Sequence, residues 1–180
     1  MAKFRGVDYM HIDSLFTEEE LLVRQTARDF VEDNVLPVIR DCYNEGRFPA
    51  HLVRQMGELG FFGAYLEGYG CAGMSSVDYG LIMQEIERGD SGIRSFNSVQ
   101  TGLVMFPIYT DGSEEQKERW LPRLASGEAI GCFGLTEPDF GSNPGGMRAT
   151  ARLEGSEWVI NGEKTWITNG SVAEVAIVWA

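Results

Sequence analysis

The spacing of apolar residues changes from a helical to a strand-like period near residue 128. Before that point, apolar residues recur every three or four positions, which is the period of amphipathic helices. After it, short alternating or continuous apolar runs are bounded by glycine and polar turns, as is typical of strands. Helices followed by strands, rather than alternating with them, indicate an α+β fold. We therefore predict an all-α domain over residues 1–128 and an antiparallel β-sheet or barrel domain over residues 129–180.

Two capping boxes predict where helices begin. Thr17 with Glu20, and Ser113 with Gln116, each place a hydroxyl at the N-cap and an acceptor three residues later. They predict helices over about 17–40 and 113–126, and Pro37 should kink the first or end it early. Further helices are expected over about 49–59, 77–88 and 93–109.

Turn signals divide the last fifty residues into strands. The runs "AIGCFGLT" and "EVAIVWA" predict buried strands at the two ends of this region. Between them, Gly155-Ser156 and Asn161-Gly162 are turn signals, and an Asn-Gly pair between alternating residues favours a two-residue hairpin. Trp166 and Thr168 are then expected on one face of a strand, because side chains alternate with period two.

Composition excludes several classes of function. The net charge of −12 argues against binding of nucleic acid or anionic membranes, which need basic patches. Cys42, Cys71 and Cys132 form no CxxC pair, so we expect neither disulfides nor a metal site, and a reducing compartment. The N-terminus lacks the apolar segment of a signal peptide, and no apolar run approaches the roughly 20 residues of a membrane span. These features predict a soluble intracellular protein.

The sequence ends inside an apolar strand, at Ala180. An exposed strand edge is a feature that natural proteins avoid. We therefore expect either that the sequence is the front part of a longer protein or that another element covers this edge.

A long polar loop separates the first strand from the hairpin. The stretch "GLTEPDFGSNPGGM", from Gly134 to Met147, combines glycines, prolines and the hydroxyls of Thr136 and Ser142. Glycines let the backbone approach a ligand, and successive N–H groups in such a loop can bind an anion. It matches neither the Rossmann nor the Walker pattern. Composition alone leaves open whether the loop is structural or binds a ligand.

A second polar stretch, "EKTWITNG", contains Trp166 and Thr168. An aromatic plane beside a hydroxyl can stack on a flat heterocycle and form a hydrogen bond with it. The alternative is that Trp166 belongs to the core.

Together, these motifs resemble those of the acyl-CoA dehydrogenase family. "CFGLTEPDFGSNPGGM", followed by "NGEKTWITNG" and "VAIVWA", has the order and spacing of that family's flavin-binding signature, and "GSEEQKERWLPRLASGE" resembles its helical domain. The resemblance implies the family's N-terminal helical domain and the first part of its middle β domain, with its C-terminal helical domain absent. It implies FAD as cofactor, held by Phe133, Gly134, Leu135, Thr136, Gly141, Ser142, Trp166, Ile167 and Thr168.

Within the family, "ERGDSGIRSFNSVQTG" resembles the substrate-binding helix of the glutaryl-CoA dehydrogenases. The resemblance implies that Arg94 binds the second carboxylate of the substrate, with Glu87, Ser95 and Ser98 nearby, and that Ser142 reaches the CoA part. A buried carboxylate needs a cation and hydrogen bonds, which these side chains supply. The residues alone leave open a purely structural ion pair of Arg94 with Glu87 or Asp90.

The resemblance also implies a reaction. Glutaryl-CoA would be oxidised at its α and β carbons and decarboxylated to crotonyl-CoA, in lysine and tryptophan degradation, with electrons passing to electron-transferring flavoprotein. The family's base is a glutamate of the C-terminal domain, so no catalytic residue is expected here, and Glu137 does not match that role. Asn143 stands where the family usually has aspartate. A homotetramer is implied, in the bacterial cytoplasm or the mitochondrial matrix.

Two alternatives to this function stay open. The substrate could instead be a short or branched monocarboxylic acyl-CoA. The chain could also be a non-catalytic module, because the family's base lies outside the residues that it matches.

Overall fold

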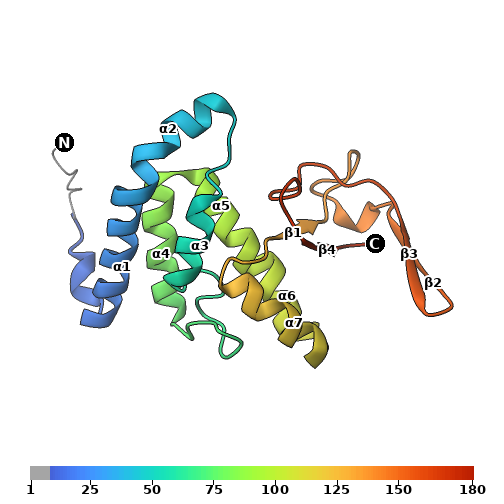
Figure 1. The fold of residues 1–180 in the computed structure, drawn as a ribbon, viewed down its shortest axis with the longest axis horizontal. Coiled ribbons are helices and arrows are strands. Elements are labelled where there is room, and N and C mark those ends of the chain that lie inside the picture. The colour runs from blue at the N-terminus through green and yellow to red at the C-terminus, as the bar shows by residue number, and fades with distance from the viewer. Residues whose placement is uncertain (1–8) are drawn as a thin grey trace.

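The computed structural model describes residues 9–180. The prediction that the N-terminus is not a signal peptide falls partly on residues 1–8, which lie outside the described residues. Helices fill one part of the molecule, and two small sheets with their long connections fill the other (Figure 1). None of the helices within residues 9–180 is both long and apolar enough to span a lipid bilayer.

The helical part packs around one apolar core. Its most buried side chains include Phe61, Phe62, Phe96, Ile82 and Leu121. The α-helices are α1 (Glu18–Phe30), α2 (Leu36–Glu45), α3 (His51–Glu58), α4 (Ser76–Gly89), α5 (Ser91–Ser98), α6 (Phe106–Asp111) and α7 (Glu114–Ala125), and a 3₁₀ turn, Ile12–Leu15, precedes them. Burial of such side chains is the main favourable term in folding, which explains why helices of modest length are stable here.

The predicted capping boxes are confirmed. The hydroxyls of Thr17 and Ser113 accept hydrogen bonds from the backbone N–H groups three residues later, and α1 and α7 start there. A third capping box, formed by Ser75 and Asp78, starts α4 and was not predicted. Because this box uses aspartate instead of the usual glutamate or glutamine, the search pattern misses it.

The first helical run does not end at Pro37, but its regular α-helix α1 stops at Phe30, before the proline. A π-helical turn, Val31–Val35, lies directly before it, and the chain continues through α2 to Glu45. Proline lacks an N–H and crowds the carbonyl four residues back, and a locally wider turn accommodates both effects. Similarly, the helix predicted over residues 93–109 consists of α5, a π-helical segment (Val99–Met105) and α6, in which Pro107 is near the start.

The two sheets differ in strand direction. β2 (Thr150–Glu154) and β3 (Glu157–Asn161) form an antiparallel hairpin, whereas β1 (Gly131–Gly134) and β4 (Val175–Val178) are parallel. The antiparallel prediction is therefore confirmed for the hairpin and wrong for β1 and β4. A tight turn fixes strand direction only for neighbours in sequence, and these two strands are joined by a long connection.

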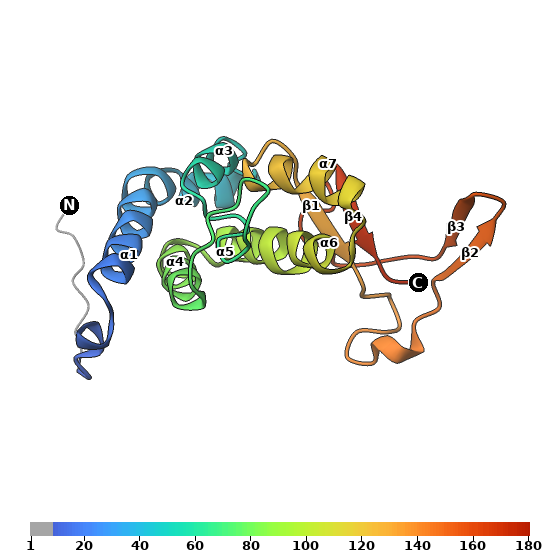
Figure 2. The ribbon, with the colours of Figure 1, turned by 90° about the horizontal axis from the view of Figure 1, so that it is seen from below.

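The hairpin turns at Gly155-Ser156 and not at Asn161-Gly162. Gly162 ends β3 with φ of 156°, and a Cβ there would lie 2.6 Å from the Cβ of Ala149, so the glycine allows a close approach of two chain segments. The hairpin projects away from the helices (Figure 2). Its side chains are almost all exposed, including Leu153 and Trp158, which face each other across the strands.

Candidate functional site

The loop after β1 is closed at its base by Glu137. Its carboxylate accepts hydrogen bonds from the backbone N–H groups of Arg148, at 2.6 Å, and Ala149, at 2.9 Å. The ammonium group of Lys164 adds a third bond, at 2.9 Å, and the Glu137 side chain is 5% exposed. The bond from the Arg148 amide, then the lysine, lowers the pKa of Glu137 to about 2. A carboxyl group so acidic is ionised at neutral pH and is a poor general base.

The segment after β3 lies against β1 and the start of this loop. Lys164 also donates to the backbone carbonyl of Leu135, and the N–H of Thr165 donates to the carbonyl of Thr136 at 2.9 Å. Further along, the amide of Asn169 donates to the carbonyl of Gly131 at 3.1 Å. These bonds bring together the two stretches that the sequence singled out, Phe133–Thr136 and Trp166–Thr168.

Trp166 lies in a turn and not in a strand, so the predicted strand is wrong at this point. Its backbone has φ of 58°, a left-handed value that is rare for a bulky residue, and its side chain is 89% exposed. Trp166 is therefore not a core residue of the described chain. Strained backbone of this kind is concentrated at ligand clamps and active sites.

The other predicted cofactor residues fall into two groups. Phe133 is half-buried and packs edge-to-face against Trp179, with ring centroids 6.1 Å apart. Gly134 lies under the aliphatic part of Lys164, whose Cγ would be 3.4 Å from a Cβ at that glycine. Gly141 and Ser142, by contrast, are exposed in the loop, away from these contacts.

Four of the five predicted substrate-binding residues form one hydrogen-bonded cluster at α4 and α5, whereas the fifth, Ser142, lies in the loop after β1 and does not join them. Arg94 Nε donates to Glu87 Oε2 at 2.6 Å, and Arg94 Nη1 lies 3.4 Å from the hydroxyl of Ser98. Ser98 in turn donates to the backbone carbonyl of Ser95, and Ser91 donates to Glu87 at 2.6 Å. The hydrogen bond from Ser91, and then that from Arg94, lowers the pKa of Glu87.

The alternative pairing of Arg94 with Asp90 is not formed. Asp90 instead caps α5 by accepting a hydrogen bond from the N–H of Ile93 at 2.8 Å. Arg94 is 38% exposed in its side chain, and the described residues provide no partner for its Nη2. One edge of the guanidinium group therefore remains available to a ligand carboxylate.

A cavity of about 650 Å³ joins the helical part to the Trp166 turn. Its wall includes Ser91 and Ile93 at the start of α5, Phe48, and, from the other side, Thr168 and Asn169. Thr168 thus lines the same cavity as the first residues of α5, the helix that carries Arg94, but Arg94 itself does not line it. The volume lies in the range of small-molecule sites.

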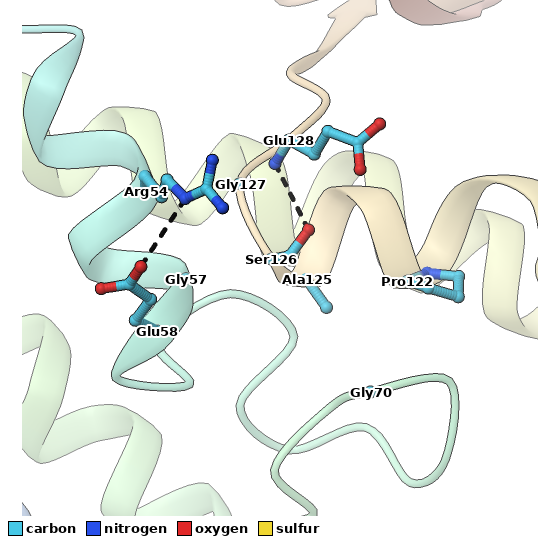
Figure 3. A pocket seen from close by; sticks show the side chains of 9 residues that line it. All are labelled: Arg54, Gly57, Glu58, Gly70, Pro122, Ala125, Ser126, Gly127 and Glu128. Carbon is cyan, nitrogen blue, oxygen red and sulfur yellow. Dashed lines mark hydrogen bonds and ion pairs between the residues drawn. The ribbon is translucent and has the colours of Figure 1, made fainter.

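A second cavity, of about 580 Å³, lies where α3 and α7 end (Figure 3). Arg54 and Glu58 form an ion pair at 3.6 Å on its wall, and the N–H of Glu128 contacts the Ser126 hydroxyl at 3.4 Å. None of the residues predicted to bind cofactor or substrate lines this cavity.

Sequence reasoning missed three residues that fix the site. Lys164 and Asn169 hold the Trp166 turn, as described above. Gln100 is fully buried in the second π-helical segment, where its amide donates to the carbonyls of Leu124 and Ala129 and accepts from the N–H of Gly131. A glutamine within an apolar helical run was the available signal, because buried polar groups are almost always hydrogen-bonded.

The geometry fits a flat heterocyclic cofactor. The turn that carries the exposed Trp166 is bonded to the loop after β1 through the N–H of Thr165 and the carbonyl of Thr136, and Thr136 and Thr168 supply hydroxyl groups in these two segments. Aromatic stacking and fixed hydrogen-bond donors are what a flavin ring requires from a protein.

Comparison with known proteins shows the family of the chain. Residues 17–128 match the profile of the acyl-CoA dehydrogenase N-terminal domain, and residues 132–180 match that of the middle domain. The human mitochondrial short-chain specific acyl-CoA dehydrogenase is 41% identical over 173 residues, which is 96% of this chain and 42% of that protein.

Two solved structures share the fold. A glutaryl-CoA dehydrogenase from Mycobacterium smegmatis in complex with FADH2 has a TM-score of 0.93 and 55% identity, over 94% of this chain and 44% of that one. A glutaryl-coenzyme A dehydrogenase in complex with glutaryl-CoA has a TM-score of 0.88 and 38% identity, over 92% and 43%. The chain thus spans about two fifths of the length of these relatives. The chain belongs to the acyl-CoA dehydrogenase family.

Proposed function

We propose that the protein, at its full natural length, is an FAD-dependent dehydrogenase that oxidises glutaryl-CoA and decarboxylates it to crotonyl-CoA. The observation that carries the substrate assignment is Arg94, held by Glu87 and Ser98 with one guanidinium edge open. A second carboxylate on the thioester distinguishes glutaryl-CoA from monocarboxylic substrates, and a guanidinium group binds carboxylates with suitable geometry.

The residues of this chain would act by binding and orientation. Bound FAD would accept the β-hydride of the thioester while a base removes the α-proton. The backbone of Phe133, Leu135 and Thr136 would hold the ring edge, Trp166 would cover one face, and Thr168 would donate a hydrogen bond near the reacting nitrogen. Fixed donors at such a position stabilise charge as it develops. Gly134, Gly141, Ser142 and Ile167 would complete the contacts to cofactor and CoA.

No residue between 1 and 180 is assigned as the base. By the family resemblance, that role belongs to a glutamate of the C-terminal domain. We further propose a domain boundary near residue 128, a homotetramer, and electron-transferring flavoprotein as the electron acceptor, all on the strength of family membership.

The test is anaerobic reduction of the purified protein by acyl-CoA thioesters. Glutaryl-CoA should bleach the visible flavin band, and crotonyl-CoA and CO2 should form on turnover. Arg94→Gln should lower kcat/KM for glutaryl-CoA by about 100-fold, because the bound carboxylate loses its cation. Its effect on butyryl-CoA should be small. Arg119→Gln, on the exposed face of α7, is the matched control and should change neither value.

A second candidate function has support of its own. The 41% identity to the human short-chain specific enzyme favours a short monocarboxylic substrate. Faster bleaching by butyryl-CoA than by glutaryl-CoA, with Arg94→Gln having no effect, would establish this alternative and overturn the glutaryl assignment. A purified chain of only 20.0 kDa that binds no flavin would instead favour the non-catalytic module.

A further inference from the structure

A buried ion pair lies between the two stretches that would hold the flavin. Glu137 and Lys164 are 5% and 13% exposed in their side chains, and their charged atoms are 2.9 Å apart. The pair sits outside the helical core, in a region where most other side chains are half-buried or exposed. Its position therefore needs an explanation other than simple core packing.

Each partner makes additional bonds to backbone atoms. Glu137 accepts from the N–H groups of Arg148 and Ala149, which lie 11 and 12 residues later, so it joins the two ends of the loop. Lys164 donates to the Leu135 carbonyl at 3.0 Å, and its aliphatic part lies over Gly134. The carboxylate and the ammonium together connect three separate backbone segments.

The residues next to Glu137 and Lys164 in the chain are also bonded to each other. The N–H of Thr165, which follows Lys164, donates to the carbonyl of Thr136, which precedes Glu137. On the N-terminal side of the Trp166 turn, the spacing to the Thr136 backbone is therefore set by the Glu137–Lys164 pair, the bond from Lys164 to Leu135 and the adjacent backbone bond, while Asn169 anchors the other side of the turn to Gly131. A shift of about 1 Å in groups that orient a reactant can change a rate by about 100-fold.

The pair is poorly suited to other roles. Lys164 presents no free charge to a ligand, because Glu137 neutralises it, and Glu137 is too acidic to act as a base. Buried ion pairs also add little to stability compared with apolar side chains of similar size. What the pair provides here is a fixed arrangement of the backbone segments to which Glu137 and Lys164 are bonded.

We propose that Glu137 and Lys164 are positioning residues that set the separation of the Leu135–Thr136 backbone from the Trp166–Thr168 turn, and thereby the affinity and orientation of the flavin. This inference rests on the proposed flavin-dependent function. Neither side chain contacts the ring itself. Their effect is transmitted through the backbone atoms to which they are bonded.

The experiment compares Lys164→Met with the wild type in the full-length protein. Methionine keeps the length of the side chain and removes the ammonium group. After removal of the flavin, the apoprotein is titrated with FAD, and the Kd should rise about tenfold in the variant, within the range seen for residues that act without ligand contact. The visible circular dichroism of the bound flavin should change, and kcat should fall while KM for the thioester stays within about twofold.

Lys117→Met is the matched control. Lys117 pairs with Glu114 on α7 at 3.0 Å and is 17% exposed, so the same substitution removes the ammonium group of a similarly covered lysine away from the site, although its partner Glu114 is 71% exposed. Its FAD affinity and kcat should equal those of the wild type. If Lys164→Met gives the same values as Lys117→Met, the inference is overturned.

A double-mutant cycle keeps the test decisive if Lys164→Met folds poorly. Glu137→Gln preserves shape, and it should weaken FAD binding by itself. Lys164→Met should then raise the Kd for FAD by a smaller factor in the Glu137→Gln background than in the wild type, because the pair acts as a unit. Strictly additive effects would contradict a shared role. Failure of the wild-type protein to bind FAD would count against the proposed function, whereas normal wild-type binding with unaffected variants would count against this inference alone.

Discussion

The helical part and the sheet part of this molecule are held together in different ways. Around Phe62 and Leu121, side chains with no exposed surface pack on one another. Around Lys164, by contrast, the chain is held by a few polar bonds, and Trp166 remains 89% exposed. Apolar packing tolerates small shifts of side chains because its energy is the sum of many weak contacts. Each hydrogen bond or ion pair in the sheet part, by contrast, fixes a particular pair of atoms.

This difference suits the two proposed roles. In the proposed function, a packed helical scaffold would provide a rigid wall for the substrate, and a thinly packed turn would leave backbone and aromatic surface free for the cofactor. It also predicts that substitutions in the two parts will have different consequences. The following changes test that contrast, starting with the largest expected effect.

Truncating the helical core should cost the most stability. Phe62 is fully buried and packs edge-to-face with Phe96, at a centroid distance of 5.8 Å. Phe62→Ala should lower the free energy of unfolding by about 3–5 kcal/mol, because it removes buried surface and leaves a cavity. Urea denaturation followed by far-UV circular dichroism measures this change. Leu22→Ala, at a side chain that is 66% exposed, should change it by less than about 0.5 kcal/mol. Similar values for both variants would contradict a single apolar core.

A glycine pair tests the close contact between α3 and the end of α7. A Cβ on Gly57 would lie 2.3 Å from the backbone oxygen of Ser126, whereas a Cβ on Gly80 in α4 would meet nothing within 4 Å. In Gly57→Ala, overpacking should lower the free energy of unfolding by about 1–3 kcal/mol, and the higher helix propensity of alanine should offset up to about 1 kcal/mol of this loss. Gly80→Ala should gain about 0.5–1 kcal/mol, since only propensity acts there. Thermal unfolding should therefore shift in opposite directions, and two stabilised variants would refute the close contact.

Acid should loosen the sheet part locally, with the smallest effect on overall stability. The pKa of Glu137 is lowered to about 2 in the folded protein, against 4.5 for an unperturbed glutamate. A lowered pKa stabilises the folded state when the carboxyl is ionised in both states. The contribution is therefore complete above about pH 4.5 and is lost as pH falls through about 2. The backbone amide resonances of Arg148 and Ala149 should report this titration by NMR.

The control for the acid titration is Glu137→Gln. In this variant, the two amide resonances should show no transition between about pH 4.5 and pH 2, because the titrating group is gone. A wild-type midpoint near 4.5 would mean that the carboxylate does not hold the loop in solution.

Local signals made the helical part predictable. Capping boxes at Thr17 and Ser113 fix helix starts through contacts three residues apart, and apolar periodicity identifies the buried face. The turn at Gly155-Ser156 is equally local. Among the local signals, the turn at Asn161-Gly162 failed. The larger errors were inferences about neighbours distant in sequence. The direction of β4 relative to β1 and the conformation around Trp166 both depend on contacts across about 30 residues or more.

The sequence by itself determined where α1 and α7 begin, the order of helices before strands and the family, because caps, periodicity and motif spacing are encoded within short stretches of chain. Only the tertiary structure decided that Lys164 reaches back to Leu135 and Glu137, that Trp166 lies exposed in a left-handed turn, and that Arg94 pairs with Glu87 and not with Asp90. Each of these depends on the position of a side chain relative to atoms brought close by folding, which no local pattern specifies.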